Sequence, residues 1–279
     1  MGAELIDHHL NKHTQHVACQ TCHIPVYSKG KPTKVFWDWS TAGKDLKKPK
    51  DKYGKPIYQK KKGSFVWKEA VKPTYRWYNG TVQRYLLGDR INEKGVTNLT
   101  MPVGDISDPA SRIYPFKLHK GKQISDAVYK YLIAPQLWEG YWKHWDWDKA
   151  SRDGMKAANL AYSGAYEFVE TAMYWGLTHE VVPKEQALSC AECHASLSEA
   201  PYCGKCHQDR PDVDFEALVK KGVDFKRMAE MGRDVKDLIG KTNYIDYKAL
   251  GYEGDPIEVR GRFKKLGGGI ALSKNPSGE

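Results

Sequence analysis

Short amphipathic segments alternate with long polar stretches along this chain of 279 residues. In several places apolar side chains recur at the three- and four-residue spacing of a helix, and each such segment is short. Serine, aspartate or glycine near the ends of these segments supports helix boundaries there. The pattern predicts helices over residues 4–18, 125–134, 148–160, 164–175, 215–221 and 225–239.

The strand signals are fewer. Two aromatic and β-branched runs flank Asn79-Gly80, which predicts a β-hairpin over residues 75–85. Residues 112–119 are extended in character but contain a proline, so we expect a loop or the edge of a strand there. Taken together, the patterns predict a mainly α fold with long irregular loops and a few short β-hairpins.

Three Cys-x-x-Cys-His units contain every cysteine of the chain. This unit is the attachment signature of c-type haem, because two thiols bond to the porphyrin and the adjacent histidine becomes the proximal ligand of the iron. We therefore expect three covalently bound haems c, around which the chain folds as a multihaem cytochrome c. The units are Cys19, Cys22 and His23; Cys190, Cys193 and His194; and Cys203, Cys206 and His207.

The last two cysteine pairs could instead hold a zinc ion with four thiolates. The histidines argue against zinc, since haem needs a ligand at that place and zinc does not. Only 10 of the 279 residues are histidine, so a histidine directly after each of three pairs is rare by chance. Disulfides are less favoured still, because a bond between cysteines so close in sequence closes almost no loop.

Seven further histidines are enough to give each of three irons a second imidazole. An iron with histidine on both faces is closed to added ligands and exchanges electrons with little rearrangement, whereas an open face allows chemistry. Methionine could serve instead, but no methionine stands in a setting that singles it out. We expect bis-histidine irons with His13, His119 and His179 as distal ligands and His9, His16 and His144 as further candidates; the sequence does not say which histidine serves which iron.

Charge and composition limit the partners and the compartment. The formal charge is +10, and a Lys-rich run over residues 44–62, broken by proline and glycine, predicts an exposed loop. We expect a solvated basic surface that meets partner proteins, and no nucleic acid. No apolar run is long enough to span a bilayer and the start does not resemble a signal peptide. Because haem of this kind is attached outside the cytoplasmic membrane, we expect a mature or excised chain in the periplasm or outside the cell.

We expect a single multihaem unit over residues 1–279. Residues 1–30 would form a His-rich helix and carry the first haem. Residues 31–185, which have no haem motif, would supply distal ligands. Residues 186–279 would hold the paired haems and C-terminal helices.

Several stretches in order resemble the C-terminal part of the octahaem tetrathionate reductase family of c-type cytochromes. They begin at His13, Phe36, Tyr114, Met173 and Gly251, and read HTQHVACQTCHIP, FWDWSTAG, YPFKLHKGKQ, MYWGLTHEVVPKEQAL and GYEGDP. The resemblance supports His13, His119 and His179 as distal ligands, since each stands in a matching stretch. It also implies that the haem resembling a catalytic centre belongs to an N-terminal portion that this sequence does not contain.

Two functions follow as expectations. The first is electron transfer by bis-histidine haems between redox partners outside the cytoplasm, or between copies of this chain in an extracellular filament. The second is an enzyme, or part of one, that reduces a small sulfur or nitrogen compound at an iron with an open face.

Overall fold

A computed structural model describes residues 10–47, 49–194 and 245–256. Of the first predicted helix, residues 10–16 are helical, and the earlier residues, His9 among them, lie outside the described part. The third Cys-x-x-Cys-His unit and the helices predicted at 215–221 and 225–239 also lie outside it.

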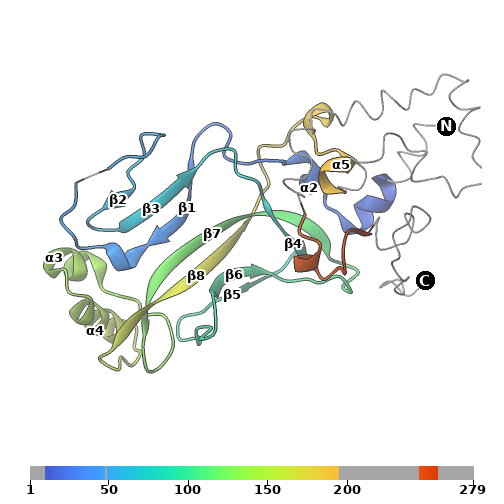
Figure 1. Cartoon of the computed structure of the whole chain (residues 1–279). Coiled ribbons are helices and arrows are strands. Elements are labelled where there is room, and N and C mark those ends of the chain that lie inside the picture. The colour runs from blue at the N-terminus through green and yellow to red at the C-terminus, as the bar shows by residue number, and fades with distance from the viewer. Residues whose placement is uncertain (1–9, 48, 195–244, 257–279) are drawn as a thin grey trace, which may run out of the picture.

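An eight-stranded mixed sheet dominates the described residues, and the predicted mainly α fold is therefore wrong (Figure 1). The sheet order is β2-β3-β1-β7-β8-β6-β5, with β4 paired to β7 off this path. β1 is parallel to β7 and β6 is parallel to β8, while the other pairs are antiparallel. The strands are β1 (Thr33–Asp38), β2 (Tyr58–Gln59), β3 (Gly63–Lys68), β4 (Thr74–Tyr78), β5 (Val82–Arg84), β6 (Thr97–Pro102), β7 (Arg112–Asp126) and β8 (Tyr166–Gly176).

The long antiparallel ladder between β7 and β8 contains most of the segment predicted as a helix at 164–175 and the first two residues of the one predicted at 125–134, and both helix predictions are wrong. The ladder runs from Phe116 opposite Gly176 to Asp126 opposite Tyr166. The segment 125–134 ends β7 and then turns, and the segment 164–175 is largely β8. Aromatic, valine and threonine side chains crowd a helix but pack well on a pleated surface, which explains why β8 is a strand.

The stretch 112–119 lies within the sheet, not in a loop or at the sheet edge, since β7 pairs with β1, β4 and β8. Pro115, which has no backbone N–H, is tolerated in β7 because it lies just before the start of the β7–β8 ladder. Its carbonyl accepts from the Leu177 backbone N–H at 3.1 Å, so the proline nitrogen also points toward the β8 side. The β7–β8 ladder begins only at Phe116, and no strand donor is therefore required of Pro115 on that side.

The predicted hairpin around Asn79-Gly80 is also wrong, although the turn exists. Gly80 has a φ of +97°, and the Asn79 side chain accepts from the Thr81 backbone N–H at 3.1 Å. β4 and β5 do not pair with each other, because β4 joins β7 and β5 joins β6. The backbone of Val103 instead bonds to residues on both sides of the turn, at Asn79 and Thr81.

The predicted helix at 148–160 is confirmed as α4 (Trp147–Ala157). Asp146 caps it by accepting from the Lys149 backbone N–H at 3.1 Å. The buried face of α4 includes Trp147, which stacks on Tyr141 with ring centroids 3.7 Å apart. Residues 44–47 and 49–57 of the Lys-rich run lie outside helices and strands, as predicted, but Tyr58 and Gln59 form β2 and Tyr58 is buried, so the predicted exposed loop is wrong there.

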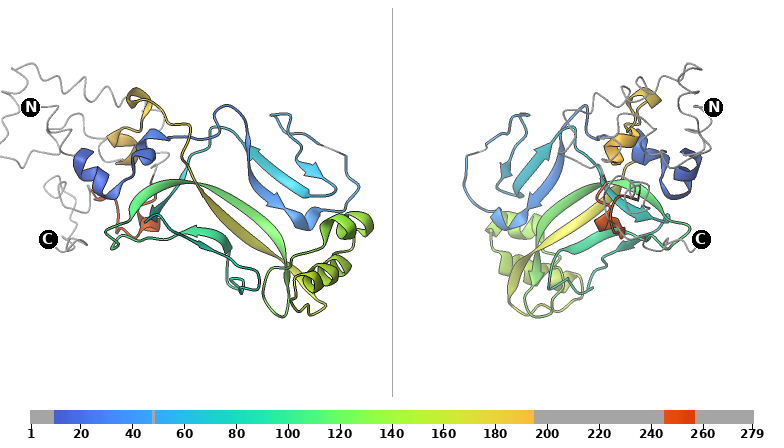
Figure 2. Two further views of the ribbon diagram at one scale, coloured as in Figure 1. Left: turned by 180° about the vertical axis from the view of Figure 1, so that it is seen from behind. Right: turned by 45° about the vertical axis from the view of Figure 1, so that its right-hand side comes forward.

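The sheet separates two groups of helices. Short helices α3 (Trp142–His144) and α4 lie at one end, whereas α2 (Cys19–His23), α5 (Cys190–Cys193) and the turn η6 (Lys248–Leu250) gather at the other (Figures 1 and 2). No described helix is long and apolar enough to cross a membrane. Both described Cys-x-x-Cys-His units therefore lie at the same end of the sheet.

Gly154 sets how closely α4 approaches the chain beside it. A Cβ at this position would lie 2.0 Å from the Ala134 backbone oxygen, a distance that no side chain can occupy. We expect Gly154→Ala to lower the free energy of unfolding by about 1–3 kcal/mol, as overpacking does. Denaturant unfolding followed by circular dichroism measures this change.

Gly30→Ala is the matched control, because a Cβ on Gly30 meets no atom within 4 Å. This variant should unfold within about 1 kcal/mol of the unmodified chain. Equal destabilisation by the two substitutions would contradict the close approach of α4.

Candidate haem sites

The first motif lies on helix α2, which is anchored to the start of β7. The Ile113 carbonyl accepts from the Ala18 backbone N–H at 3.0 Å and from the Thr21 hydroxyl at 2.7 Å. Thr21 is buried between the two cysteines of the motif, while Cys19 is exposed and Cys22 is half-buried. The bond from the buried Thr21 hydroxyl fixes helix α2 against β7. On this helix the thiol of Cys19 is exposed and accessible for bonding.

The imidazole of His23 is oriented by a segment 159 residues further along the chain. Its Nδ1 lies 2.9 Å from the Val182 backbone oxygen. A carbonyl only accepts, so Nδ1 carries the proton and donates. The lone pair of the neutral ring is then on Nε2, which is the arrangement that an iron ligand requires.

The second motif lies on α5, directly after a loop that touches the first motif. The Leu188 backbone N–H donates to the Cys22 carbonyl at 2.9 Å, and Cys193 is buried. His194 follows the helix, and its Nδ1 lies 2.8 Å from Asp255 Oδ1. The same nitrogen is 3.1 Å from the hydroxyl of Tyr247, which also donates to the Cys193 carbonyl. Because a carboxylate only accepts, Nδ1 of His194 carries the proton and donates to Asp255. The lone pair of the neutral ring is then on Nε2, as in His23.

The segment 245–256 holds this second motif from the other side. Its buried side chains pack with strands β4 and β7 in one cluster, and the Trp77 indole donates to the Leu250 carbonyl at 2.7 Å. The cluster consists of Tyr75, Trp77, Ile113, Leu188, Cys193, Ile245, Tyr247 and Leu250. Reasoning from the sequence missed Tyr247 and Asp255 as site residues, although Asp255 stands in the GYEGDP stretch that carries the resemblance.

His13 is brought to the second motif and not to its neighbour in sequence. The rings of His13 and His194 have centroids 6.0 Å apart and are inclined at 75°. His13 and His16 are both exposed on this helix, and it is the His13 ring that lies close to His194. The described N-terminal helix thus carries one histidine toward α5.

The other candidates lie in different surroundings. His119 is half-buried on β7, and its Nδ1 lies 3.2 Å from the Lys34 backbone oxygen. Burial lowers the pKa of His119, which favours the neutral ring that can bind iron. The side chain of His179 is 73% exposed, three residues before the Val182 that orients His23.

His144 lies on α3, at the end of the sheet opposite the two motif helices (Figure 1). Its Nδ1 accepts from the Asp146 backbone N–H at 3.1 Å, so the proton of the neutral ring is on Nε2. That nitrogen is buried against Gly140. The structure does not bring His144 together with the described motifs.

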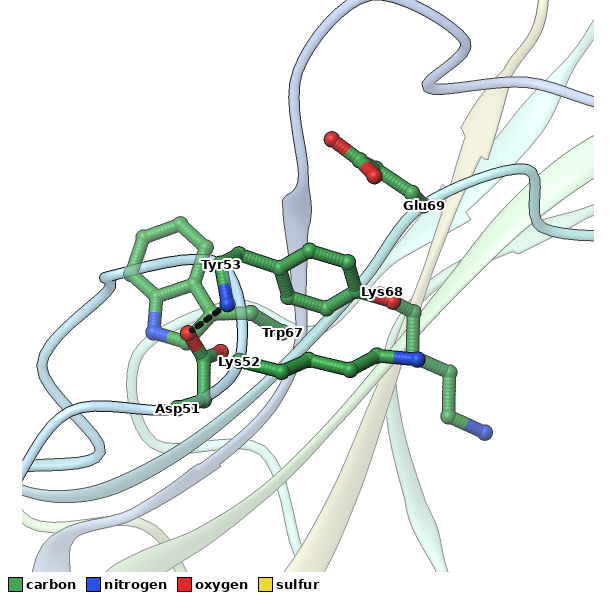
Figure 3. Close-up of a pocket in the computed structure, with 6 residues that line it drawn as sticks. All are labelled: Asp51, Lys52, Tyr53, Trp67, Lys68 and Glu69. Carbon is green, nitrogen blue, oxygen red and sulfur yellow. Dashed lines mark hydrogen bonds between the residues drawn. The ribbon is translucent and has the colours of Figure 1, made fainter.

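A hollow of about 370 Å³ lies beside β3, away from these motifs (Figure 3). Trp67 and Tyr53 form its aromatic sides, and Asp51 accepts from the Tyr53 backbone N–H at 2.9 Å. Lys52, Lys68 and Glu69 complete the lining. None of the cysteines or histidines of the described motifs lines it, and no cluster of three or more metal-binding side chains occurs among the described residues.

Comparison with known proteins agrees with the motifs. The family model described as "Cytochrome c bacterial" matches residues 34–197, more than half of the chain. The chain belongs to the bacterial cytochrome c family. Haem c bound through thioether bonds is therefore its cofactor. His23 and His194, the histidines of the two described motifs, fit that cofactor, since each has Nδ1 bonded to the protein and Nε2 available.

A solved structure supports a multihaem cytochrome. The chain is similar to the octahaem cytochrome c from Shewanella oneidensis, with 42% identity and a TM-score of 0.70. The match covers 90% of this chain and 49% of the octahaem protein, so the chain spans about half its length. No curated protein matches.

The Thr21 hydroxyl offers a test of how α2 is anchored. Thr21→Val keeps the shape of the side chain but removes the donor to the Ile113 carbonyl, so we expect the free energy of unfolding to fall by about 1 kcal/mol. Thr14→Val is the control, since the exposed Thr14 hydroxyl bonds only within its own helix. Denaturant unfolding of the haem-loaded chains should show a loss for the first variant and almost none for the second, and the reverse order would contradict the anchor.

Proposed function

We propose that this cytochrome transfers electrons through three haems c held by bis-histidine ligation. The proposed attachment sites are Cys19 and Cys22, Cys190 and Cys193, and Cys203 and Cys206, with His23, His194 and His207 as proximal ligands. When bound, each haem supplies an iron that takes up and gives back one electron. The residues of the chain attach it, orient the proximal imidazole and close its second face.

The spacing of His13 and His194 carries this proposal. An imidazole nitrogen binds a metal at about 2 Å and the ring centre lies about 1 Å further back, so rings on opposite faces of one iron are roughly 6 Å apart. The two ring centroids are 6.0 Å apart. We infer that His13 and His194 are the two axial ligands of one iron, which leaves no position for an added anion or gas.

His119 and His179 remain the proposed distal ligands for the other two irons. The lowered pKa of His119 supports a neutral ring, and His179 stands near the segment that orients His23.

The proposed partners are redox proteins outside the cytoplasm or further copies of this chain. Similarity to half of an eight-haem cytochrome supports a chain that works beside additional haems, as a filament subunit does. The same similarity supports the second candidate, part of a multihaem enzyme. The spin state of the irons, and whether they bind added ligands, distinguish the two functions.

Purified haem-loaded protein should show only low-spin ferric iron by electron paramagnetic resonance, because every axial position is filled. Addition of nitrite or cyanide, or of carbon monoxide to the reduced protein, should leave the visible spectrum unchanged. A high-spin signal that responds to nitrite would contradict the relay and favour the enzyme.

Replacement of His13 tests the ligand assignment directly. We expect His13→Ala to convert one iron to a high-spin form that binds carbon monoxide when reduced, and added imidazole should restore the low-spin signal. His16→Ala is the control, since this histidine lies on the same helix and is exposed, as His13 is, but is not the histidine whose ring lies close to His194. The assignment fails if the spectrum of His13→Ala is unchanged or if both variants behave alike.

A further inference from the structure

The two described proximal imidazoles differ in the group that accepts from Nδ1. For His23 the acceptor is the neutral carbonyl of Val182, at 2.9 Å. For His194 it is the carboxylate of Asp255, at 2.8 Å. The irons that these imidazoles would hold would therefore have ligands of unequal donor strength, because a carboxylate draws the Nδ1 proton more strongly than a carbonyl does.

Burial strengthens the effect of the Asp255 charge on the imidazole of His194. The side chains of His194 and Asp255 are 12% and 5% exposed. Water screens such a pair weakly, so the negative charge acts on the imidazole through a medium of low polarity. The Tyr247 ring lies parallel to the His194 ring, with centroids 5.8 Å apart, and shields it further.

We propose that Asp255 lowers the reduction potential of the iron bound by His194, relative to the iron bound by His23. The inference rests on the proposed function, since it takes His194 as an axial ligand. A negative charge bonded to the ligand stabilises the ferric form over the ferrous form, and the added electron is disfavoured at this iron. Of these two irons, the one held by His23 would then take up an electron more readily, which favours transfer from the iron of His194 to the iron of His23.

Other contacts hold the segment that carries Asp255. The Trp77 indole bonds to the Leu250 carbonyl, and the Tyr247 hydroxyl bonds to the Cys193 carbonyl. Asp255→Asn keeps the size of the side chain and an oxygen acceptor but removes the charge. The variant separates the electrostatic role of Asp255 from its role in packing.

The experiment is a spectroelectrochemical titration of the haem-loaded chain and its Asp255→Asn variant. We expect the equilibrium constant for reduction of one haem to rise about tenfold, which is about 59 mV for a one-electron couple. The remaining haems should keep their potentials, and all irons should stay low-spin. An unchanged set of potentials, or an equal shift of every haem, would overturn the proposal.

Asp246→Asn is the matched control. Asp246 belongs to the same segment and carries the same charge, but it is exposed and bonds to the Ala249 backbone N–H. Water screens its charge, so the potentials should barely change. A shift as large as that of Asp255→Asn would show a general effect of charge and overturn the specific role of Asp255.

A second measurement needs no variant. In the fully reduced, diamagnetic protein, nuclear magnetic resonance should place the Nδ1 proton of His194 further downfield than that of His23, because its hydrogen bond goes to a charged acceptor. The opposite order would overturn the role of Asp255 while leaving bis-histidine ligation intact. High-spin iron in the unmodified protein would instead contradict the proposed function itself.

Discussion

Ile113 joins both described motifs to the sheet. Its carbonyl holds the start of helix α2 through the Ala18 backbone and the Thr21 hydroxyl. Its side chain is buried in the cluster that contains Cys193 and the segment 245–256. Helices of four or five residues have too little surface to hold themselves in place, so their position depends on this first part of β7. The sheet thus fixes the positions of the two described motif helices.

A ligand histidine must keep one nitrogen for the iron and bond the other to the protein. The histidines of both described motifs meet this requirement, and in both cases the partner comes from far along the chain, at Val182 and Asp255. His13 reaches the second motif from a helix more than 170 residues earlier. The site is therefore a product of the tertiary structure, even though its most recognisable residues are adjacent in sequence.

The parts predicted from sequence and the parts missed differ in their physical origin. The Cys-x-x-Cys-His units and helix α4 could be predicted, because adjacency and capping are local properties. The sequence predicts a helix where β8 lies, and a loop or the edge of a strand at the start of β7, because the ladder that makes both central strands joins residues far apart in the chain. Tyr247 and Asp255 carry no local signal of their own, and only packing reveals their place beside His194.

The proposed relay requires that His13 and His194, which are 181 positions apart in the sequence, bind the same iron. An experimental structure of the haem-loaded chain tests this most directly, through the distances from the iron beside Cys193 to the two Nε2 atoms. We expect both distances to be about 2 Å, with the rings on opposite faces of the porphyrin. An iron bound to His194 whose other face is open, or is filled by a residue other than His13, would contradict it.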